Sequence, residues 1–404
     1  MAHPIRGFLI MIGQQSYSRR GFNHLLFSAG LMGVAGVAQH RALGATSSYF
    51  KVHEFDGRHL FATPRGEPFF AISFNHIDSS AMRYPENIHL WQDRYGASEE
   101  RWIKERVAPD LKAWGFNSIG WNQEVVLREP DYHWHSPNWT RDHYNWTGMP
   151  YFHNLAFLEA HRWKLGRKWP DVYSRDFEMW CDYVARENCA ALADDANLIG
   201  YYFTDVPLLV NKSDRYPAKD TIHDPELLQT PAGRAKIAKD TRRYYQVTCD
   251  AIRRYDTNHL IFGDRYNLAT PMPEPVIDTA AEFIDAIGVQ LGGALEDTSP
   301  KMTRWSERTG LPFIVADATR TNKRDPAGGS RHDPEKYNFL LNAMRDNRHC
   351  LGVNLCGGFV RNRSRQKGVY DEQERPDQEA IEGFTKTNRG IREWYLGLKS
   401  KPVL

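Results

Sequence analysis

The sequence predicts an α/β fold, a (β/α)8 barrel of the TIM type preceded by a short β-hairpin. Short apolar runs alternate with helix-periodic segments almost to the C-terminus, which is typical of parallel strands joined by helices. Two of these runs, residues 199–208 and 312–318, reach an aspartate as they end, Asp205 and Asp317. Such barrels carry their polar functional groups at these strand ends. The strand candidates approach eight and no nucleotide-binding glycine motif follows any of them, which favours a closed barrel over an open sheet.

The composition excludes several classes of partner. The 404 residues include 52 Lys+Arg and 50 Asp+Glu, a balance that predicts neither nucleic acid nor an acidic membrane surface as a partner. Twelve Trp and nineteen Tyr suit a groove for sugar rings, although large cores also use aromatic side chains. The five cysteines form no CxxC or other metal-site spacing, so we expect buried thiols, no metal site and no cofactor. No feature indicates an oligomeric state.

Residues 1–45 predict a twin-arginine signal peptide. Arg19 and Arg20 follow Ser18 and precede Gly21-Phe22, and residues 25–38 form an apolar stretch rich in Ala and Gly. The stretch is short for a membrane span, so we expect cleavage near residue 45 rather than anchoring. A chance arginine pair is the alternative. Residues 46–404 would then form a single barrel domain, periplasmic or secreted and not attached to a membrane.

The elements follow in order from local patterns. Residues 55–68 predict the hairpin, because Asp-Gly and Arg-Gly turns separate short alternating runs. Residues 99–114 predict a helix whose buried face carries Trp102, Val107, Leu111 and Trp114. Further strands are expected at residues 69–74, 115–121, 151–157, 199–205, 259–264, 286–290, 312–317 and 352–357, and further helices at 176–188, 232–255, 300–309, 337–347 and 378–399.

Residues 129–146 contain many Tyr, His, Trp and Asn and show no period. We expect a long loop there, of the kind that is usually functional. A metal site built from His133, His135 and His143 is one alternative for this segment.

The strand ends carry carboxylates, amides and one histidine. Glycosidic cleavage needs one carboxylic acid to protonate the leaving oxygen, and a second carboxylate to attack or to activate water. A structural alternative is that these aspartates only cap helices or form turns. The candidate catalytic residues are Asp205, Asp317, Asp264 and Glu124, and the candidate substrate-binding residues are Asn75, His76, Trp121, Asn122, Tyr202, Arg265 and Gln290.

Four segments read Phe-Ala-Ile-Ser-Phe-Asn-His-Ile-Asp (70–78), Trp-Gly-Phe-Asn-Ser-Ile-Gly-Trp (114–121), Trp-Pro-Asp-Val-Tyr-Ser (169–174) and Leu-Ile-Gly-Tyr-Tyr-Phe (198–203). In this order they resemble the agarase-type β-galactan hydrolases of the retaining (β/α)8 clan. The resemblance covers most of the mature chain. It implies a barrel that hydrolyses a polysaccharide or oligosaccharide.

The sequence departs from the family's pattern at the acid/base residue. Asp205 falls where the family has Asn, Val206 where it has the acid/base Glu, and Asp317 on the nucleophile. A valine cannot transfer a proton, which leaves three outcomes. Asp205 replaces the acid and pairs with Asp317 across the wider gap of an inverting enzyme. Alternatively, Asp264 or Glu124 supplies the second carboxylate, or the barrel binds sugar without cleaving it.

Two further alternatives stay open. A metal-dependent hydrolase on the same scaffold is one of them. The other concerns Arg361, Arg363 and Arg365 after the last strand, which are either solvated or grip an acidic sugar.

Overall fold

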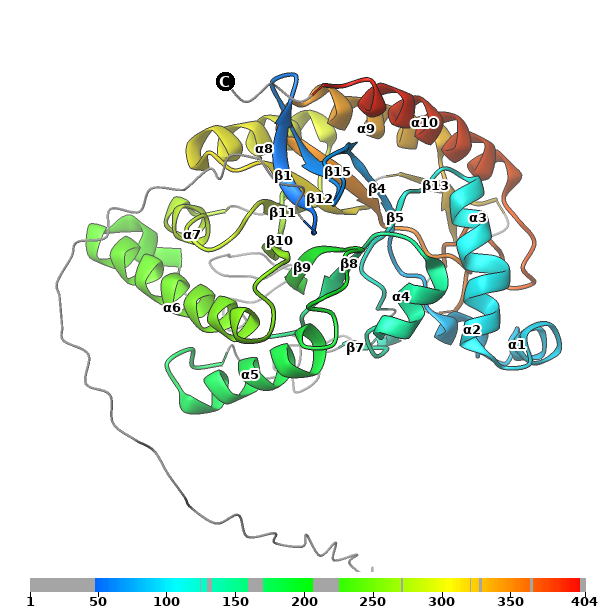
Figure 1. Ribbon diagram of the computed structural model, residues 1–404, viewed down its shortest axis with the longest axis horizontal. Helices are drawn as coiled ribbons and strands as arrows, with labels where there is room; N and C mark the ends of the chain where they lie inside the picture. The colour runs from blue at the N-terminus through cyan, green and yellow to red at the C-terminus, as the bar shows by residue number, and fades with distance from the viewer. Residues whose placement is uncertain are drawn as a thin grey trace, which may run out of the picture. The chain divides into compact units, whose positions relative to one another are not determined.

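Eight parallel strands close into a barrel, which confirms the predicted fold (Figure 1). The computed structural model describes residues 48–123, 125–128, 133–158, 170–205, 225–269, 272–319, 321–326, 329–363 and 366–399. The predicted signal peptide, Glu124 and Val206 lie outside these residues. Around the barrel the strand order is β4 (Ala71–Phe74), β5 (Ser118–Ile119), β8 (Tyr151–Asn154), β9 (Leu198–Asp205), β10 (Leu260–Asn267), β11 (Ile287–Leu291), β12 (Phe313–Ala318) and β15 (Cys350–Leu355).

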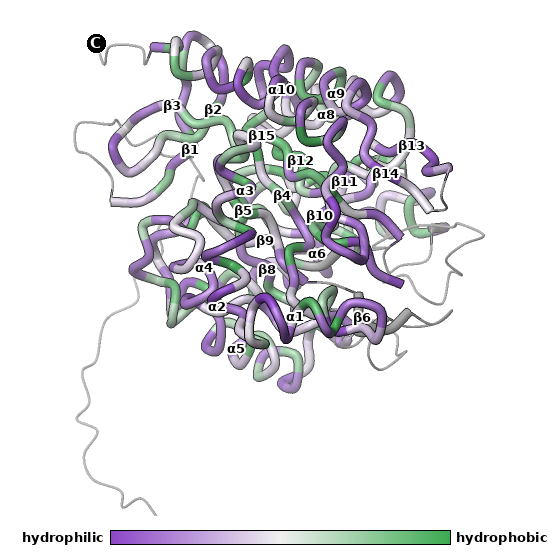
Figure 2. Tube along the Cα trace, turned by 90° about the vertical axis from the view of Figure 1, so that its right-hand side faces the viewer, coloured by the Kyte–Doolittle hydropathy of each residue, from purple (hydrophilic) through white to green (hydrophobic). Residues whose placement is uncertain are grey.

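Helices surround the strands and cover their outer faces (Figure 1). They are α1 (Ile88–Tyr95), α2 (Glu99–Trp102), α3 (Ala108–Ala113), α4 (Arg141–Thr147), α5 (Arg175–Cys189), α6 (Pro231–Tyr255), α7 (Glu274–Ala280), α8 (Leu295–Thr309), α9 (Pro334–Asp346) and α10 (Gln378–Leu396). The strands are predominantly hydrophobic, and hydrophilic residues gather on the outer helices (Figure 2). Among the described residues, no helix combines the length and the apolar character that a membrane span needs.

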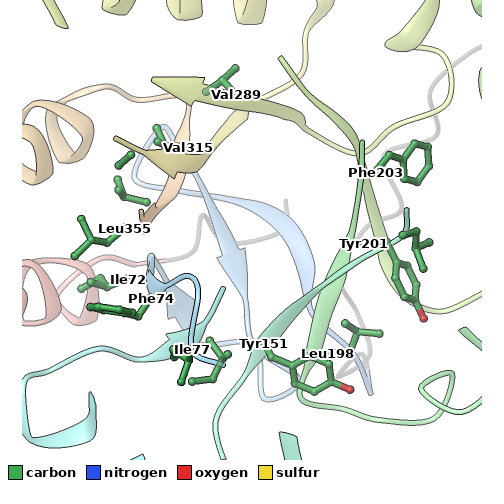
Figure 3. Packing of buried hydrophobic residues seen from close by; sticks show 14 of the residues in the cluster. Ile72, Phe74, Ile77, Tyr151, Leu198, Tyr201, Phe203, Val289, Val315 and Leu355 are labelled. Carbon is green, nitrogen blue, oxygen red and sulfur yellow. The ribbon is translucent and has the colours of Figure 1, made fainter. Parts of the chain in front are cut away.

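The larger hydrophobic cluster lies between strands and helices. Figure 3 shows Tyr201 and Phe203 of β9 and Leu355 of β15 pointing away from the centre of the barrel. A second, smaller cluster fills the inside of the barrel and includes Phe152, Tyr202, Phe262 and Ile314. Burial of these apolar side chains on both faces explains why the strands read as continuous apolar runs.

The N-terminal strands close the end of the barrel at which its parallel strands begin. The range predicted as a hairpin, residues 55–68, contains β2 (Arg58–Ala62) and the start of β3 (Pro68–Phe69), and β1 (Lys51–Phe55) adds a third antiparallel strand before them. Phe61 of β2 contributes to the inner cluster, with its ring centroid 6.2 Å from that of Phe152 and 6.0 Å from that of Phe262. The mouth at the carboxyl ends of the strands therefore carries the site.

The helix predicted at residues 99–114 is present, and all four side chains of its predicted face are buried. It contains a π-helical stretch, η2 (Ile103–Val107), between α2 and α3, in which Ala108 N–H bonds Ile103 O. The next residue, Pro109, has no N–H to continue the regular ladder, and the wider turn accommodates it.

The segment predicted as a loop contains regular structure. A short antiparallel pair forms from β6 (Val125–Arg128) and β7 (His133–His135), and α4 follows. Helix α4 has seven residues, too few for a clear hydrophobic period. Its start is fixed by a capping box, in which Thr140 N–H donates to His143 Nδ1 (3.2 Å).

Candidate active site

Asp317 is the central carboxylate of the barrel mouth. It lies near the end of β12, and its side chain is buried. Asn75 Nδ2 donates to Asp317 Oδ1 (3.3 Å) and Gln290 Nε2 donates to Asp317 Oδ2 (3.1 Å). Asn75 Nδ2 also donates to Ala316 O (2.9 Å), so carbonyl and carboxylate together fix its orientation. Neutral amides from the ends of β4 and β11 therefore orient Asp317.

A β-bulge turns Asp317 into the mouth. In the β11–β12 pairing, Val289 lies opposite Val315 but Gln290 lies opposite Asp317, so one residue of β12 is extra. Val315 packs in the outer cluster and Ala316 in the inner one. Strict alternation would turn Asp317 outward again. The extra residue lets Asp317 follow Ala316 to the inside, as bulges beside functional sites commonly do.

A second bulge has the opposite effect on Asp264. Gly263 in β10 has φ of 66°, and the pairing with β9 shifts on both sides of it. Phe262 faces inward, so alternation would place Asp264 inside. Instead Asp264 accepts hydrogen bonds from Tyr244 and Tyr245 of α6, both at 3.0 Å, and lies on the helix side. The structure thus separates Asp264 from Asp317.

Arg265 occupies the inward position that Asp264 leaves. It is fully buried, and its guanidinium carbon lies 3.8 Å from the ring centroid of Trp121. Trp121 Nε1 donates to Ala316 O (3.2 Å), next to Asp317. The His76 ring meets Trp121 edge-on at 4.3 Å. Arg265 covers one face of Trp121, a cation–π contact that joins β10 to the residue that bonds Ala316 O.

His76 adopts an unusual backbone conformation at the end of β4. Its φ is 60°, in the left-handed region that non-glycine residues seldom occupy. His76 N–H donates to Trp121 O (3.1 Å), and His76 Nδ1 lies 2.7 Å from Gln123 O. A carbonyl oxygen only accepts, so Nδ1 carries a proton and donates it to Gln123 O. Such locally strained residues cluster at functional sites.

Several strand-end amides keep unused hydrogen-bonding atoms. Within the described part of the chain, these buried atoms have no partner: Asn75 Oδ1, Asn122 Nδ2, Asn154 Oδ1, Gln290 Oε1 and Asn354 Oδ1. Buried polar atoms usually find partners, so these five atoms are available to bond a ligand that enters the mouth.

The remaining candidate residues that the structure describes are Tyr202, Asn122 and Asp205. Tyr202 lies in the inner cluster and its hydroxyl accepts from Asn354 Nδ2 (3.3 Å); burial raises the pKa of Tyr202 well above its usual value. Asn122 Oδ1 accepts from Ile77 N–H (3.3 Å). Asp205 is the last residue of β9, and its Cα lies opposite that of Arg265 in the backbone pairing of β9 with β10. Because β9 and β12 are parallel, Asp205 and Asp317 end at the same mouth.

Cys356 joins this group without having been predicted. A ring nitrogen of His76, a carboxylate oxygen of Asp317 and Cys356 Sγ all lie within 4.8 Å of one another, and the three residues are buried. All five cysteines are buried, as expected. The position of Cys356 directly after the last strand was the available signal, because it repeats the placement of the other candidates.

The alternative histidine cluster has a different role. His143 Nε2 donates to Glu99 Oε2 (2.9 Å) while its Nδ1 accepts from Thr140, so both ring nitrogens have structural partners. The hydrogen bond from His143 lowers the pKa of Glu99 to about 2. The side chain of His133 lies outside the described residues. His143 thus joins α4 to α2.

Two of the three arginines after the last strand pair with carboxylates. Arg361 bonds Glu372 (2.9 Å) and Asp325 (3.1 Å), and Arg363 bonds Glu86 (2.5 Å). Arg365 lies outside the described residues. These ion pairs hold the loops around the mouth.

Comparison with known proteins gives structural but not sequence relatives. No protein-family model and no curated protein matches the chain. The agarase AgWH50C superposes with a TM-score of 0.66 at 13% identity, over 87% of this chain and 64% of that one. An exo-β-agarase gives 0.63 at 15% identity, over 87% of this chain and 66% of that one. A β-glucuronidase from Bacteroides uniformis gives 0.53 at 12% identity, over 84% of this chain and 37% of that one.

This chain spans less than two thirds of each of these three structures. At such low identities the likeness concerns the fold. The chain is a (β/α)8 barrel that remotely resembles the agarase-type barrels, as its sequence predicted.

Proposed function

We propose that this protein is a glycoside hydrolase that cleaves O-glycosidic bonds in a polysaccharide or oligosaccharide, an agarase-like β-galactan or a related glycan. The observation that carries the proposal is Asp317, a buried carboxylate that a bulge turns into the barrel mouth and that Asn75 and Gln290 orient. The fold shared with solved agarases supports the choice of substrate class.

The polar lining of the mouth suits a sugar. Each hydroxyl of a sugar both donates and accepts, and the unused amide atoms of Asn75, Gln290 and Asn354 offer acceptors close to Asp317. Arg265 supplies a buried cation packed on Trp121. Such convergent polar groups around one carboxylate favour a poly-hydroxyl ligand over an apolar one.

Asp317 acts with a second carboxylate, for which we propose Asp205. Asp264 accepts hydrogen bonds from two tyrosines on the helix side, which supports the choice of Asp205 over Asp264. The pairing is supported by the ends of β9 and β12, which lie at the same mouth of the barrel. An inverting mechanism requires carboxyl groups about 6.5–9.5 Å apart, with room for a water between them. In this scheme Asp317 is the base that activates the water, and Asp205 protonates the leaving oxygen.

The test is a screen of the mature protein against a glycan panel, with new reducing ends as the readout. Release from a β-galactan or a related glycan supports the proposal, and NMR of the first product gives its anomeric configuration. Inversion supports the pair of Asp205 and Asp317. Retention would instead assign the second role to another carboxylate, Glu124 being the remaining candidate. Binding without any reducing ends would replace the hydrolase with a glycan-binding barrel.

We also propose that the chain reaches the periplasm or the medium through the twin-arginine pathway. Arg19 and Arg20 before an apolar stretch support this route. An extracytoplasmic location suits a polymeric glycan substrate, which does not cross the inner membrane intact.

A further inference from the structure

We infer that the ends of β12, β15 and β4 form a site for one Zn²⁺ ion, with His76, Asp317 and Cys356 as its ligands. One ligand atom from each residue lies within 4.8 Å of the other two. The three side chains are of three different ligand types, and each is buried at the barrel mouth. Nothing in the proposed glycoside hydrolysis uses the thiol.

The barrel topology brings the three residues together. Strands β12, β15 and β4 are consecutive in the barrel, so their carboxyl ends are neighbours. Cys356 N–H donates to Ala318 O (3.2 Å), which joins the end of β15 to that of β12. Asn75 N–H donates to Leu355 O (3.0 Å), which joins the end of β4 to β15. Backbone bonds thus fix the positions from which the ligands project.

His76 has the tautomer that a metal ligand needs. Its Nδ1–H donates to Gln123 O (2.7 Å), so in the neutral ring the lone pair lies on Nε2. Histidine ligands typically donate their second ring N–H to a carbonyl or carboxylate, which sets the orientation of the ring. The left-handed backbone at His76 (φ 60°) and the packed Trp121 edge hold the imidazole in place.

Asp317 and Cys356 are also supported from outside the cluster. Asn75 and Gln290 donate to the two carboxylate oxygens of Asp317, and ligating carboxylates are usually hydrogen-bonded in this way. Lys367 Nζ donates to the carbonyl oxygen of Cys356, which anchors the backbone at the thiol. Each ligand therefore has a partner that orients it.

The donor set selects the ion. Thiolate and imidazole favour Zn²⁺ among the common divalent ions, whereas Mg²⁺ and Ca²⁺ prefer oxygen ligands alone. Tetrahedral Zn²⁺ with bonds of about 2.0–2.3 Å places its ligand atoms about 3.3–3.7 Å apart, so the cluster must contract by about 1 Å. Three protein ligands leave the fourth position to water or a ligand from the mouth.

The proposed metal site and the proposed glycan cleavage both use the carboxylate of Asp317. If the proposed function holds, a carboxylate that coordinates Zn²⁺ cannot act as the base, so Zn²⁺ inhibits hydrolysis. This consequence rests on the proposed function, but the metal site itself does not, because binding is measured without any sugar.

The test uses the mature protein, freed of metal with a chelator and then titrated with Zn²⁺ or Co²⁺. We expect one ion per chain by equilibrium dialysis, and a near-ultraviolet thiolate-to-Co²⁺ charge-transfer band. Cys356→Ser should lose the band and weaken binding at least tenfold. Cys350→Ser is the matched control, because Cys350 is a buried thiol at the opposite end of β15 and should leave both unchanged.

Should Cys356→Ser fail to fold, His76→Gln supplies the second variant, again with binding weakened at least tenfold. Absence of the thiolate band, or unchanged binding in the variants, would overturn the site. A glycan assay with and without Zn²⁺ separates the two proposals. Metal binding without any hydrolysis leaves the site standing and removes the hydrolase, whereas hydrolysis without metal binding does the reverse.

Discussion

Gln290 of β11 donates a side-chain hydrogen bond to Asp317 of β12 (3.1 Å), at a β-bulge that shifts the register of the two strands. The bulge and the hydrogen bond act together: the first aims the carboxylate inward, and the second fixes its rotation. Asn75 completes the support from β4.

Asp317→Asn should abolish turnover while leaving the fold intact. The change removes the charge and basicity but keeps the shape, so we expect kcat to fall about 10⁴-fold or more. The new amide nitrogen would face one of two N–H donors, and Gln290 can turn its unused Oε1 toward it. Circular dichroism and a thermal melt should therefore stay close to the parent. Normal turnover with a lower Tm would mean that Asp317 is structural.

Asp264→Asn is the matched control, with the opposite expected outcome. Both carboxylate oxygens of Asp264 accept from tyrosine hydroxyls in a fully buried setting. An amide accepts at one end only, so we expect a loss of about 2–3 kcal/mol in the free energy of unfolding. Urea denaturation measures it, and kcat should stay near the parent value. A large loss of turnover in a stable variant would return Asp264 to the site.

Gly120→Ala should displace Asn75 from Asp317. A Cβ at residue 120 would lie 1.8 Å from Asn75 Oδ1, so the amide must rotate away. We expect lower kcat and a stability cost of about 1–3 kcal/mol. Gly390→Ala in α10 is the control, because nothing lies within 4 Å of its Cβ, and helix propensity should make it neutral or slightly stabilising. Unchanged kcat in Gly120→Ala would show that the Asn75 amide does not support catalysis.

His153 should make the protein acid-sensitive. It is buried on the outer face of β8 between Tyr144 and Asn188, and burial lowers its pKa from 6.5 to about 4. The unfolded chain therefore takes up the proton first. The free energy of unfolding is therefore unaffected by His153 above pH 6.5, and it falls by about 3 kcal/mol as the pH falls from 6.5 towards 4.

Urea midpoints measured between pH 4 and 7 test this dependence. His153→Gln cannot take up the proton, so its stability should fall less over that interval than the parent's. Parallel pH profiles of the two proteins would contradict the assignment.

Export through the twin-arginine pathway predicts that changing both Arg19 and Arg20 to Lys leaves the precursor in the cytoplasm. Cell fractionation with detection of precursor and mature forms measures it. The matched control changes Arg6, which lies outside the Ser-Arg-Arg motif, to Lys and should be processed normally. Normal processing of the double variant would refute the assignment.

The sequence predicted the barrel because its signals repeat. The spacing of Trp102, Val107, Leu111 and Trp114 sets a helix face, and each apolar run with its polar end marks a strand. These patterns extend over many residues, so the predicted fold class stays correct even where one predicted element is wrong. The loop predicted at residues 129–146 shows the limit, since α4 depends on a cap at Thr140 rather than on a period.

The site was predicted less completely because bulges are local. Alternation along β10 favours Asp264 as the inward residue, but Gly263 adopts a backbone conformation that reverses the next positions. Asp317 reaches the mouth only through an extra residue in β12. Cys356 was classed with the other buried thiols although it directly follows the last strand, and its closeness to His76 and Asp317 appears only in three dimensions.

The bulge at Gly263 means that one backbone conformation, as well as the residue types, sets the charge of the barrel interior. Phe262 faces inward, so a regular strand of the same length would place Asp264 at the mouth and Arg265 against the tyrosines of α6. Gly263→Val would favour that regular pairing, because a β-branched residue seldom adopts a φ of 66°. A substitution that adds and removes no charge would thus exchange a positive interior for a negative one.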